Sequence, residues 1–345
     1  MDKLFLNELR SCKEEIDRAV QQDSFLSEMT PNDCTTLIPS YLRAFQQFTN
    51  GGKRIRAYLV KLGYEMTAGK PNPKILLPAL SYEVFQSGIL IHDDIIDESD
   101  TRRGMPAMHV TLGDGQIGRS KAICVGDIGL FAAVDLVARA DFDPQLVLRA
   151  VRHQVKVFEY TGAGEIKDIE LAELDRAWED RILRMYMLKT SWYTIIGPLQ
   201  LGAILAGADE EFLRKIEKIG LAMGIAFQIM DDVIGIFGKS DVIGKSNLSD
   251  MQEGKQTVLA AHFAEHATRA QTEEFRRYYG VRASGAEALQ AVQALFRAVG
   301  SYDYAMNLCR DYAERAGAGI AELPVAEEYR QILRSFLDYL CSRSV

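Results

Sequence analysis

Apolar residues recur every three or four positions through nearly the whole chain, as at Leu80, Val84, Ile91 and Ile95. This period matches one face of an α-helix, whereas a half-buried β-strand needs strict alternation of apolar and polar residues. No long alternating stretch occurs in the sequence. The pattern therefore predicts an all-α fold.

Segments rich in Pro, Gly, Asn and Asp divide the chain into about ten or more predicted helices. These breaks are EMTPNDC, TAGKPNPK, DTRRGMPAMHVTLGDGQIG, ADFDP, AGADEE and FGKSDVIGKSNLSDMQEGKQT. None has the composition of a flexible linker, and no fixed-period repeat or low-complexity segment occurs. We therefore expect residues 1–345 to form a single compact helical domain.

Composition limits the classes of function. Of the 345 residues, 48% are hydrophobic, which allows a large core, and the formal net charge of −8 disfavours binding to nucleic acid or anionic membranes. No apolar run reaches transmembrane length, and the first residues resemble an amphipathic helix rather than a leader. Five cysteines without metal-ligand spacing fit free thiols. We expect a cytoplasmic protein that binds no nucleic acid and does not insert stably into a membrane.

A first acidic cluster ends the apolar segment SYEVFQSGILIHDDIID. On a helix, Asp93 and Asp97 are four residues apart and therefore project from the same face. Two stacked carboxylates repel each other, so the pair requires a cation or full solvation. The alternative to a cation site is a solvated helix end, partly neutralised by Arg102 or Arg103.

A second acidic pair, Asp231 and Asp232, follows the strongly apolar stretch IGLAMGIAFQIM. Burying two neighbouring carboxylates without a counter-charge is costly. Hard carboxylate oxygens on facing helices suit Mg²⁺, which retains several waters and joins carboxylates to the phosphates of a substrate. The two acidic clusters together predict bound Mg²⁺ and a shared polyphosphate.

Basic residues lie next to the acidic clusters in the sequence. The segment NGGKRIRA places Lys53 and Arg56 after paired glycines, where helix-start amides and side-chain cations together can bind an anion. A solvated basic turn is the alternative for this segment taken alone. The cations that directly follow the two acidic clusters are Arg102, Arg103, Lys245 and Lys255.

Three further polar residues interrupt apolar helical segments. Lys189 and Thr190 lie within YMLKTSWYTIIGP, where Pro198 is expected to bend or end the helix. A lysine in this setting is usually a surface residue that extends its charge into solvent. The functional alternative is contact with a phosphate, aided by carbonyl oxygens of a locally loosened helix. Gln228 lies about one turn before Asp231 and would face the same site.

In order and spacing, these motifs resemble the polyprenyl synthetase family, the trans-isoprenyl diphosphate synthases. The resemblance spans about residues 51–257 and rests on GGKRIR, Gln86, DDIID, RRG, KT, FQIMDD and the Lys245/Lys255 pair. It implies a single all-α bundle around a deep central cavity, a homodimer, and about three Mg²⁺ ions in each active site once substrate is bound.

The resemblance also implies roles for individual residues. Those implied to bind Mg²⁺ are Asp93, Asp97 and Asp231. Those implied to contact the allylic diphosphate are Arg102, Lys189, Thr190, Gln228, Lys245 and Lys255. Of these, the residues implied to assist catalysis are Arg102, Lys189, Thr190 and Gln228. Those implied to bind isopentenyl diphosphate are Lys53, Arg56, Gln86 and Arg103.

The implied activity is a Mg²⁺-dependent, head-to-tail (1'-4) condensation of isopentenyl diphosphate with an allylic diphosphate. Cationic groups neutralise the diphosphate as its C–O bond breaks, which lowers the cost of forming an allylic carbocation. The double bond of isopentenyl diphosphate attacks that cation, and loss of a proton gives an all-trans polyprenyl diphosphate. Apolar walls keep water away from the cation.

The sequence departs from the family pattern at two positions. Gly235 stands where many members have another acid, which leaves the metal binding of the second cluster to Asp231 and Asp232. Ala57 stands where proline is common, which we expect to change only the entry into the helix.

Product length is predicted from residues before Asp93, along the flank that includes Ile89, Gly88, Phe85 and Tyr82. Members that stop at C15 often carry bulky aromatic residues four or five positions before the first aspartate, where this chain has Ile89 and Gly88. Phe85 is the first large ring, about 12 Å from Asp93. We therefore expect a C20 product, geranylgeranyl diphosphate, with farnesyl (C15) or geranylfarnesyl (C25) diphosphate as the alternatives.

Two other functions would use part of the same pattern. A terpene cyclase also needs an aspartate-rich helix and Mg²⁺, but it has no use for a second diphosphate site such as Lys53, Arg56 and Arg103 would form. A non-catalytic subunit that only binds prenyl diphosphates would be expected to lack the first acidic cluster or the basic residues, and both are present.

Overall fold

The computed structural model describes residues 4–22, 37–174, 176, 178–238 and 248–342. Its longer helices are α1 (Leu4–Gln22), α2 (Leu37–Thr49), α3 (Ile55–Ala68), α4 (Leu76–Ile96), α6 (Gly115–Ala138), α7 (Pro144–Ala172), α10 (Glu210–Phe237), α15 (Ala286–Ala298), α16 (Ser301–Ala321) and α17 (Glu327–Cys341). The shorter elements are η2 (Pro73–Ile75), β1 (Thr101–Arg102), β2 (Met105–Pro106), α5 (Met108–Thr111), α8 (Glu179–Tyr186), η3 (Met187–Ile196), α9 (Gly197–Leu205), α12 (Ser249–Glu253), α13 (Val258–His266) and α14 (Arg269–Phe275). The predicted all-α class and helix number are confirmed.

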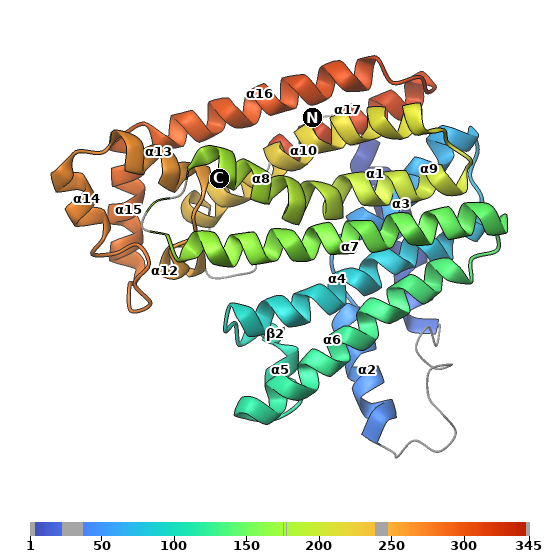
Figure 1. Ribbon diagram of the computed structural model, residues 1–345, viewed down its shortest axis with the longest axis horizontal. Helices are drawn as coiled ribbons and strands as arrows, with labels where there is room; N and C mark the ends of the chain where they lie inside the picture. Colours follow the sequence, from blue (N-terminus) through green and yellow to red (C-terminus); the bar gives the residue numbers. More distant parts are fainter. Residues whose placement is uncertain (1–3, 23–36, 175, 177, 239–247, 343–345) are drawn as a thin grey trace.

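The long helices differ in direction, and several follow the length of the molecule (Figure 1). In Figure 1, α7, α10 and α16 follow the longest axis, α4 and α6 lie along one side, and α12 to α15 gather at one end. The two strands form a small antiparallel hairpin just after α4. This arrangement directs the C-terminal ends of α4 and α7 toward the short helices.

Helix α10 connects the two parts of the hydrophobic core. Its first half packs with α9, η3, α16 and α17, and residues such as Ile219 and Met223 belong to the same buried cluster as α1, α3 and α4. Its second half packs with α8, α13, α15 and α16, through residues such as Ile229 and Val233. The helix begins at Glu210, and the carboxylate of the preceding Asp209 accepts a hydrogen bond from the amide of Phe212, which explains the defined start.

Contrary to the expectation from the sequence, two of the described segments are long and apolar enough to cross a membrane by length and composition, Pro73–Ile96 and Glu210–Phe237. About two thirds or more of each apolar window is buried inside the bundle, 67% and 72%. Both helices also end in the acidic clusters. Their hydropathy is therefore accounted for by their place in the protein core.

Glycines allow η3 to lie very close to its two neighbours. A Cβ atom at Gly164 of α7 would lie 2.4 Å from the backbone nitrogen of Lys189, and one at Gly224 of α10 would lie 2.3 Å from the Ser191 hydroxyl. Such distances exclude a side chain at either glycine. The close packing holds η3 between α7 and α10, with Lys189 and Thr190 at the centre of the bundle.

Candidate active site

A cavity of about 680 Å³ opens between α3, α4, α7, η3, α10, α12 and α17. Sequence positions far apart meet there. The predicted site residues that line the cavity are Lys53, Arg56, Gln86, Ile89, Asp93, Asp97, Lys189, Thr190, Gln228, Asp231 and Lys255. Lys245 lies outside the described residues. Arg102 and Arg103 do not line the cavity: Arg102 contacts the lining residue Asp93, and Arg103 lies against Gly52 in the turn before α3.

The first acidic cluster is held by Arg102 on the hairpin. Asp94 is fully buried and accepts a hydrogen bond from Nε of Arg102 at 2.6 Å. A terminal nitrogen of the same guanidinium lies 3.0 Å from Asp93. Burial lowers the pKa of Arg102, but Asp94, Asp93 and Asp97 raise it more, so its net pKa lies above the ordinary value. Arg102 therefore fixes the end of α4 so that Asp93 and Asp97 border the cavity.

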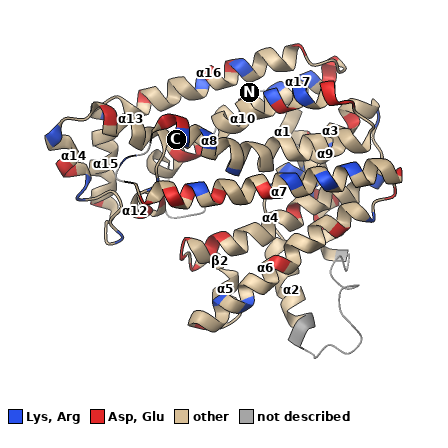
Figure 2. Ribbon diagram, in the orientation of Figure 1, with Lys and Arg blue, Asp and Glu red and all other residues tan. Residues whose placement is uncertain are grey.

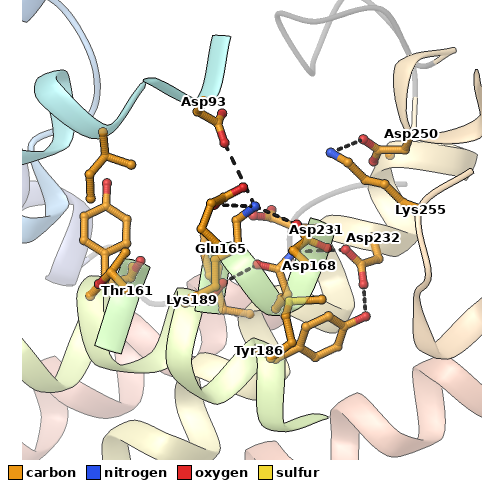
Figure 3. A pocket seen from close by; sticks show the side chains of 18 of the residues that line it. Asp93, Thr161, Glu165, Asp168, Tyr186, Lys189, Asp231, Asp232, Asp250 and Lys255 are labelled. Atoms are coloured by element: carbon orange, nitrogen blue, oxygen red, sulfur yellow. Dashed lines mark hydrogen bonds and ion pairs between the residues drawn. The ribbon is translucent and has the colours of Figure 1, made fainter. Parts of the chain in front are cut away.

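Two acids of α7 that sequence reasoning missed, Glu165 and Asp168, lie next to Lys189 in the cavity (Figure 3). The ammonium lies 2.6 Å from Asp168, 2.9 Å from Glu165 and 4.0 Å from Asp93. Burial lowers the pKa of Lys189, but the three carboxylates raise it by more. The net pKa lies above the ordinary value, so Lys189 remains charged. Their spacing in GEIKD, three residues apart on one helix face, was the available signal.

The helix that carries Lys189 and Thr190 is a π-helix over its whole length, Met187–Ile196. The predicted local loosening of this segment is therefore confirmed, and π-helical turns are often found at functional sites. The Thr190 hydroxyl donates to Oε1 of Gln228 at 2.5 Å. The amide of Gln228 in turn donates to Asp232 at 2.9 Å, so the three side chains form one chain of hydrogen bonds.

Of the second acidic pair, Asp232 is the more constrained residue. Its other carboxylate oxygen accepts a hydrogen bond from the buried Tyr186 hydroxyl. Burial raises the pKa of Asp232 to about 8, although the bonds from Tyr186 and Gln228 act to lower it. Both Asp232 oxygens therefore already accept hydrogen bonds from the protein. The metal-binding role expected of the second acidic pair stays a prediction, with Asp231 as the ligand that the resemblance implies.

The GGKRIR segment forms a tight turn before α3. Gly51 and Gly52 have φ angles of 94° and 88°, in the region that favours glycine. Arg54 turns inward and is 2% exposed, with its guanidinium 2.8 Å from Asp17 and 3.2 Å from Glu83. This buried ion-pair network anchors the turn to α1 and α4.

Three cations gather around the GGKRIR turn. Lys53 donates to the Tyr339 hydroxyl of α17 at 2.8 Å. The Arg56 guanidinium lies 3.9 Å from the centre of the Tyr193 ring and donates to Thr194 at 2.9 Å. Arg103 lies against the turn, since a Cβ atom at Gly52 would be 3.3 Å from its guanidinium. The sequence offered no signal for Tyr339, which reaches the cavity only because α17 packs beside α1.

The chain-length residues do not share one wall. Ile89 lines the cavity, whereas Phe85, Tyr82 and Gly88 do not. Gly88 faces α6, because a Cβ atom there would lie 2.9 Å from the Gly126 carbonyl oxygen. The expectation that Gly88 borders the path of the product tail is therefore wrong in this structure. Helix packing, rather than an open tunnel, accounts for the glycine.

The acids of the cavity have the chemistry of a Mg²⁺ site. Figure 2 marks Asp and Glu positions on the ribbon near the C-terminal ends of α4 and α7, and Lys189 places a cation beside Asp168. Within the described residues, no three His, Cys, Asp or Glu side chains enclose a metal position by themselves. This arrangement fits Mg²⁺, which takes few protein carboxylates and completes its shell with water and substrate phosphates.

The fold is that of isoprenyl diphosphate synthases. A geranylgeranyl pyrophosphate synthase structure from Corynebacterium glutamicum, complexed with isoprenyl diphosphate and magnesium, superposes with a TM-score of 0.85 at 26% identity, covering 100% of this chain and 99% of that one. The enzyme from Pyrococcus horikoshii superposes with a TM-score of 0.84 at 27% identity, with 99% of each chain covered.

The polyprenyl synthetase family profile matches residues 39–296, and the chain belongs to this family. It is therefore a prenyltransferase. The geranylgeranyl diphosphate synthase of Methanosarcina mazei is 30% identical over 293 residues, covering 85% of this chain and 86% of that protein. The geranylfarnesyl diphosphate synthase of Aeropyrum pernix is 31% identical, covering 85% of this chain and 91% of that protein.

Proposed function

We propose that this enzyme condenses isopentenyl diphosphate head to tail with allylic diphosphates in a Mg²⁺-dependent reaction, and that its main product is all-trans geranylgeranyl diphosphate. The observation that supports the proposal is the single cavity in which two acidic clusters meet two separate sets of cations. Asp93 and Asp97 on α4 and Asp231 on α10 are the proposed ligands of about three Mg²⁺ ions. Bound Mg²⁺ supplies the positive charge that stabilises the departing diphosphate.

Different side chains of the cavity bind the two substrates in this proposal. Lys189 and Lys255 bind the allylic diphosphate, with Arg102 holding the first acidic cluster in place. Thr190 and Gln228, which are hydrogen-bonded to each other, direct oxygen atoms toward the developing allylic cation. Lys53, Arg56, Gln86 and Arg103 hold isopentenyl diphosphate on the other side. Lys245 remains a proposed diphosphate contact.

An assay with purified protein, labelled isopentenyl diphosphate, Mg²⁺ and each allylic primer in turn tests this function, with chromatography of the dephosphorylated products. Products longer than the primer by whole five-carbon units are expected, and excess chelator should abolish them, because the acidic clusters then repel the anionic substrates. Condensation that continues in chelator contradicts the metal assignment. Cyclic hydrocarbon from a single substrate identifies a cyclase instead.

The two sets of cations should separate kinetically. Lys53→Ala and Arg56→Ala are expected to raise the apparent KM for isopentenyl diphosphate about 10- to 100-fold, the loss of one charge-assisted hydrogen bond. Lys255→Ala should instead affect the allylic substrate. Lys74→Ala is the control, because Lys74 pairs with Asp141 on the surface. Equal effects of all three site variants on both substrates would contradict the division.

The proposed product length rests on a stacked aromatic pair below the cavity. Phe85 of α4 and Phe158 of α7 stack with ring centroids 3.3 Å apart and an interplanar angle of 4°. Each ring lies just beyond the last lining residues of its helix, which are Gln86 and Thr161. This position supports the proposal that the pair stops the growing chain at C20.

Removing this pair should lengthen the product. We expect Phe85→Ala/Phe158→Ala to shift the distribution toward C25 and longer chains, and Ile89→Phe to shift it toward C15, because Ile89 borders the cavity above the pair. Product chromatography measures both. Phe263→Ala is the control for a buried ring lost elsewhere, since Phe263 is 1% exposed and belongs to the other part of the core. An active double variant with unchanged products would exclude the pair as the floor.

We also propose a single catalytic domain that forms a cytoplasmic homodimer. Helix α10 contributes to both parts of the core, which supports one domain.

Large apolar residues are exposed on α6, with Phe131 at 73% and Ile117 at 66%, and a second copy would cover them. The described cysteines, Cys12, Cys124, Cys309 and Cys341, are free thiols, as expected in a reducing compartment. Sedimentation equilibrium tests the dimer.

A further inference from the structure

Gly235 lies one helical turn after Asp231 on α10, so a side chain there would share the face of Asp231. The first acidic cluster uses this same spacing, with Asp93 and Asp97 on α4. In the second cluster the helix offers no carboxylate at the matching position. The space beside Gly235 is nevertheless not empty.

The carboxylate of Asp250, from α12, occupies that space. A Cβ atom built at Gly235 would lie 2.0 Å from Oδ2 of Asp250 and 3.1 Å from its carboxyl carbon. Asp250 and Gly235 both line the cavity together with Asp231. Helix α10 has no acid at position 235, but the carboxylate of Asp250 from α12 lies where a side chain at position 235 would begin.

We propose that Asp250 is a metal-binding residue that completes the second acidic cluster in place of a side chain at position 235. This inference rests on the proposed Mg²⁺-dependent function. In this proposal Asp231 and Asp250 bind one cation together, as Asp93 and Asp97 do in the first acidic cluster. Asp232 supports them from behind, with both carboxylate oxygens hydrogen-bonded to Tyr186 and Gln228.

The alternative role of Asp250 is as a simple ion-pair partner. Lys255 lies 3.1 Å from Asp250 and 3.2 Å from Glu253. If Asp250 served only to neutralise Lys255, Glu253 would be an equivalent residue. The two acids differ in position, because Asp250 lines the cavity against Gly235 and Glu253 does not line it. Glu253→Gln is therefore a matched control for Asp250→Asn.

The test measures ion binding rather than turnover. Purified protein is titrated with Mn²⁺ as a paramagnetic substitute for Mg²⁺, in saturating methylenediphosphonate, and free Mn²⁺ is followed by electron paramagnetic resonance against a protein-free reference. Asp250→Asn should weaken at least one ion about 10- to 100-fold, the range expected when support of a metal site is lost. Glu253→Gln should bind Mn²⁺ as the unmodified protein does.

An exchange variant tests the position itself. Gly235→Asp/Asp250→Gly moves the carboxylate back to α10 and removes the side chain that would collide with it. Recovery of most of the lost Mn²⁺ affinity supports the proposal. Unchanged binding in Asp250→Asn, or an equal loss in Glu253→Gln, overturns it. Because binding is measured without isopentenyl diphosphate, a protein that binds the ions but fails to condense substrates contradicts the proposed function and not this assignment.

Discussion

Asp93→Ala is expected to reduce turnover by roughly two orders of magnitude or more, the scale of losing a group that stabilises charge in the transition state. Asp93 lines the cavity, contacts Arg102 at 3.0 Å and lies 4.0 Å from Lys189. Asp97→Ala should behave similarly, because the two carboxylates share one helix face. Steady-state rates at saturating Mg²⁺ and substrates provide the measurement.

The fold should survive this change. Arg102 keeps its hydrogen bond to the buried Asp94, so the end of α4 remains held. Helicity by circular dichroism is therefore expected to be unchanged. Asp135→Ala is the control, because Asp135 forms an exposed ion pair with Arg139, a type of contact worth at most about 1 kcal/mol. Near-normal turnover in Asp93→Ala would show that the acidic face is only solvated.

Lys189→Ala is expected to have the second large effect, on both activity and metal response. The variant loses the ammonium that binds the allylic diphosphate and leaves Glu165, Asp168 and Asp93 without their shared cation. Turnover should fall by roughly 100-fold or more. The melting temperature without metal should also fall, because partly buried carboxylates then repel one another.

Added Mg²⁺ should raise the melting temperature of Lys189→Ala more than that of the unmodified protein, since a divalent ion replaces the lost positive charge. Differential scanning calorimetry with and without Mg²⁺ measures this difference. Lys167→Ala is the control, because Lys167 lies on α7 beside Asp168 but is exposed. If Lys189→Ala shows the same Mg²⁺ response as the unmodified protein, its ammonium and the ion do not share the acidic site.

Local geometry explains which features were predictable from the residues. Helix periodicity identified the fold class, and the four-residue spacing of Asp93 and Asp97 placed both on one face of α4. The expected local loosening around Lys189 is a π-helix, and the chain continues directly into α9, which contains Pro198. The paired glycines of GGKRIR correctly indicated a turn. In each case the determining interactions lie within a few residues of each other.

Contacts between helices that are distant in the sequence could not be predicted from local sequence patterns. Glu165 and Asp168 gain their role from Lys189, which reaches them only because Gly164 lets α7 and η3 approach closely. Gly88 looked like an opening in a tunnel wall, but it serves the packing of α4 against α6.

The second acidic cluster shows most clearly which features follow from the sequence and which depend on the tertiary structure. The sequence alone determined that α10 carries Asp231 and Asp232 and lacks an acid at Gly235. Only the tertiary structure decided that Asp250 occupies the place beside Gly235, and that Asp232 turns toward Tyr186. The reason is physical: the spacing of side chains along one helix follows from its fixed rise and turn, whereas the side chain that fills a gap on its surface depends on how other helices pack against it.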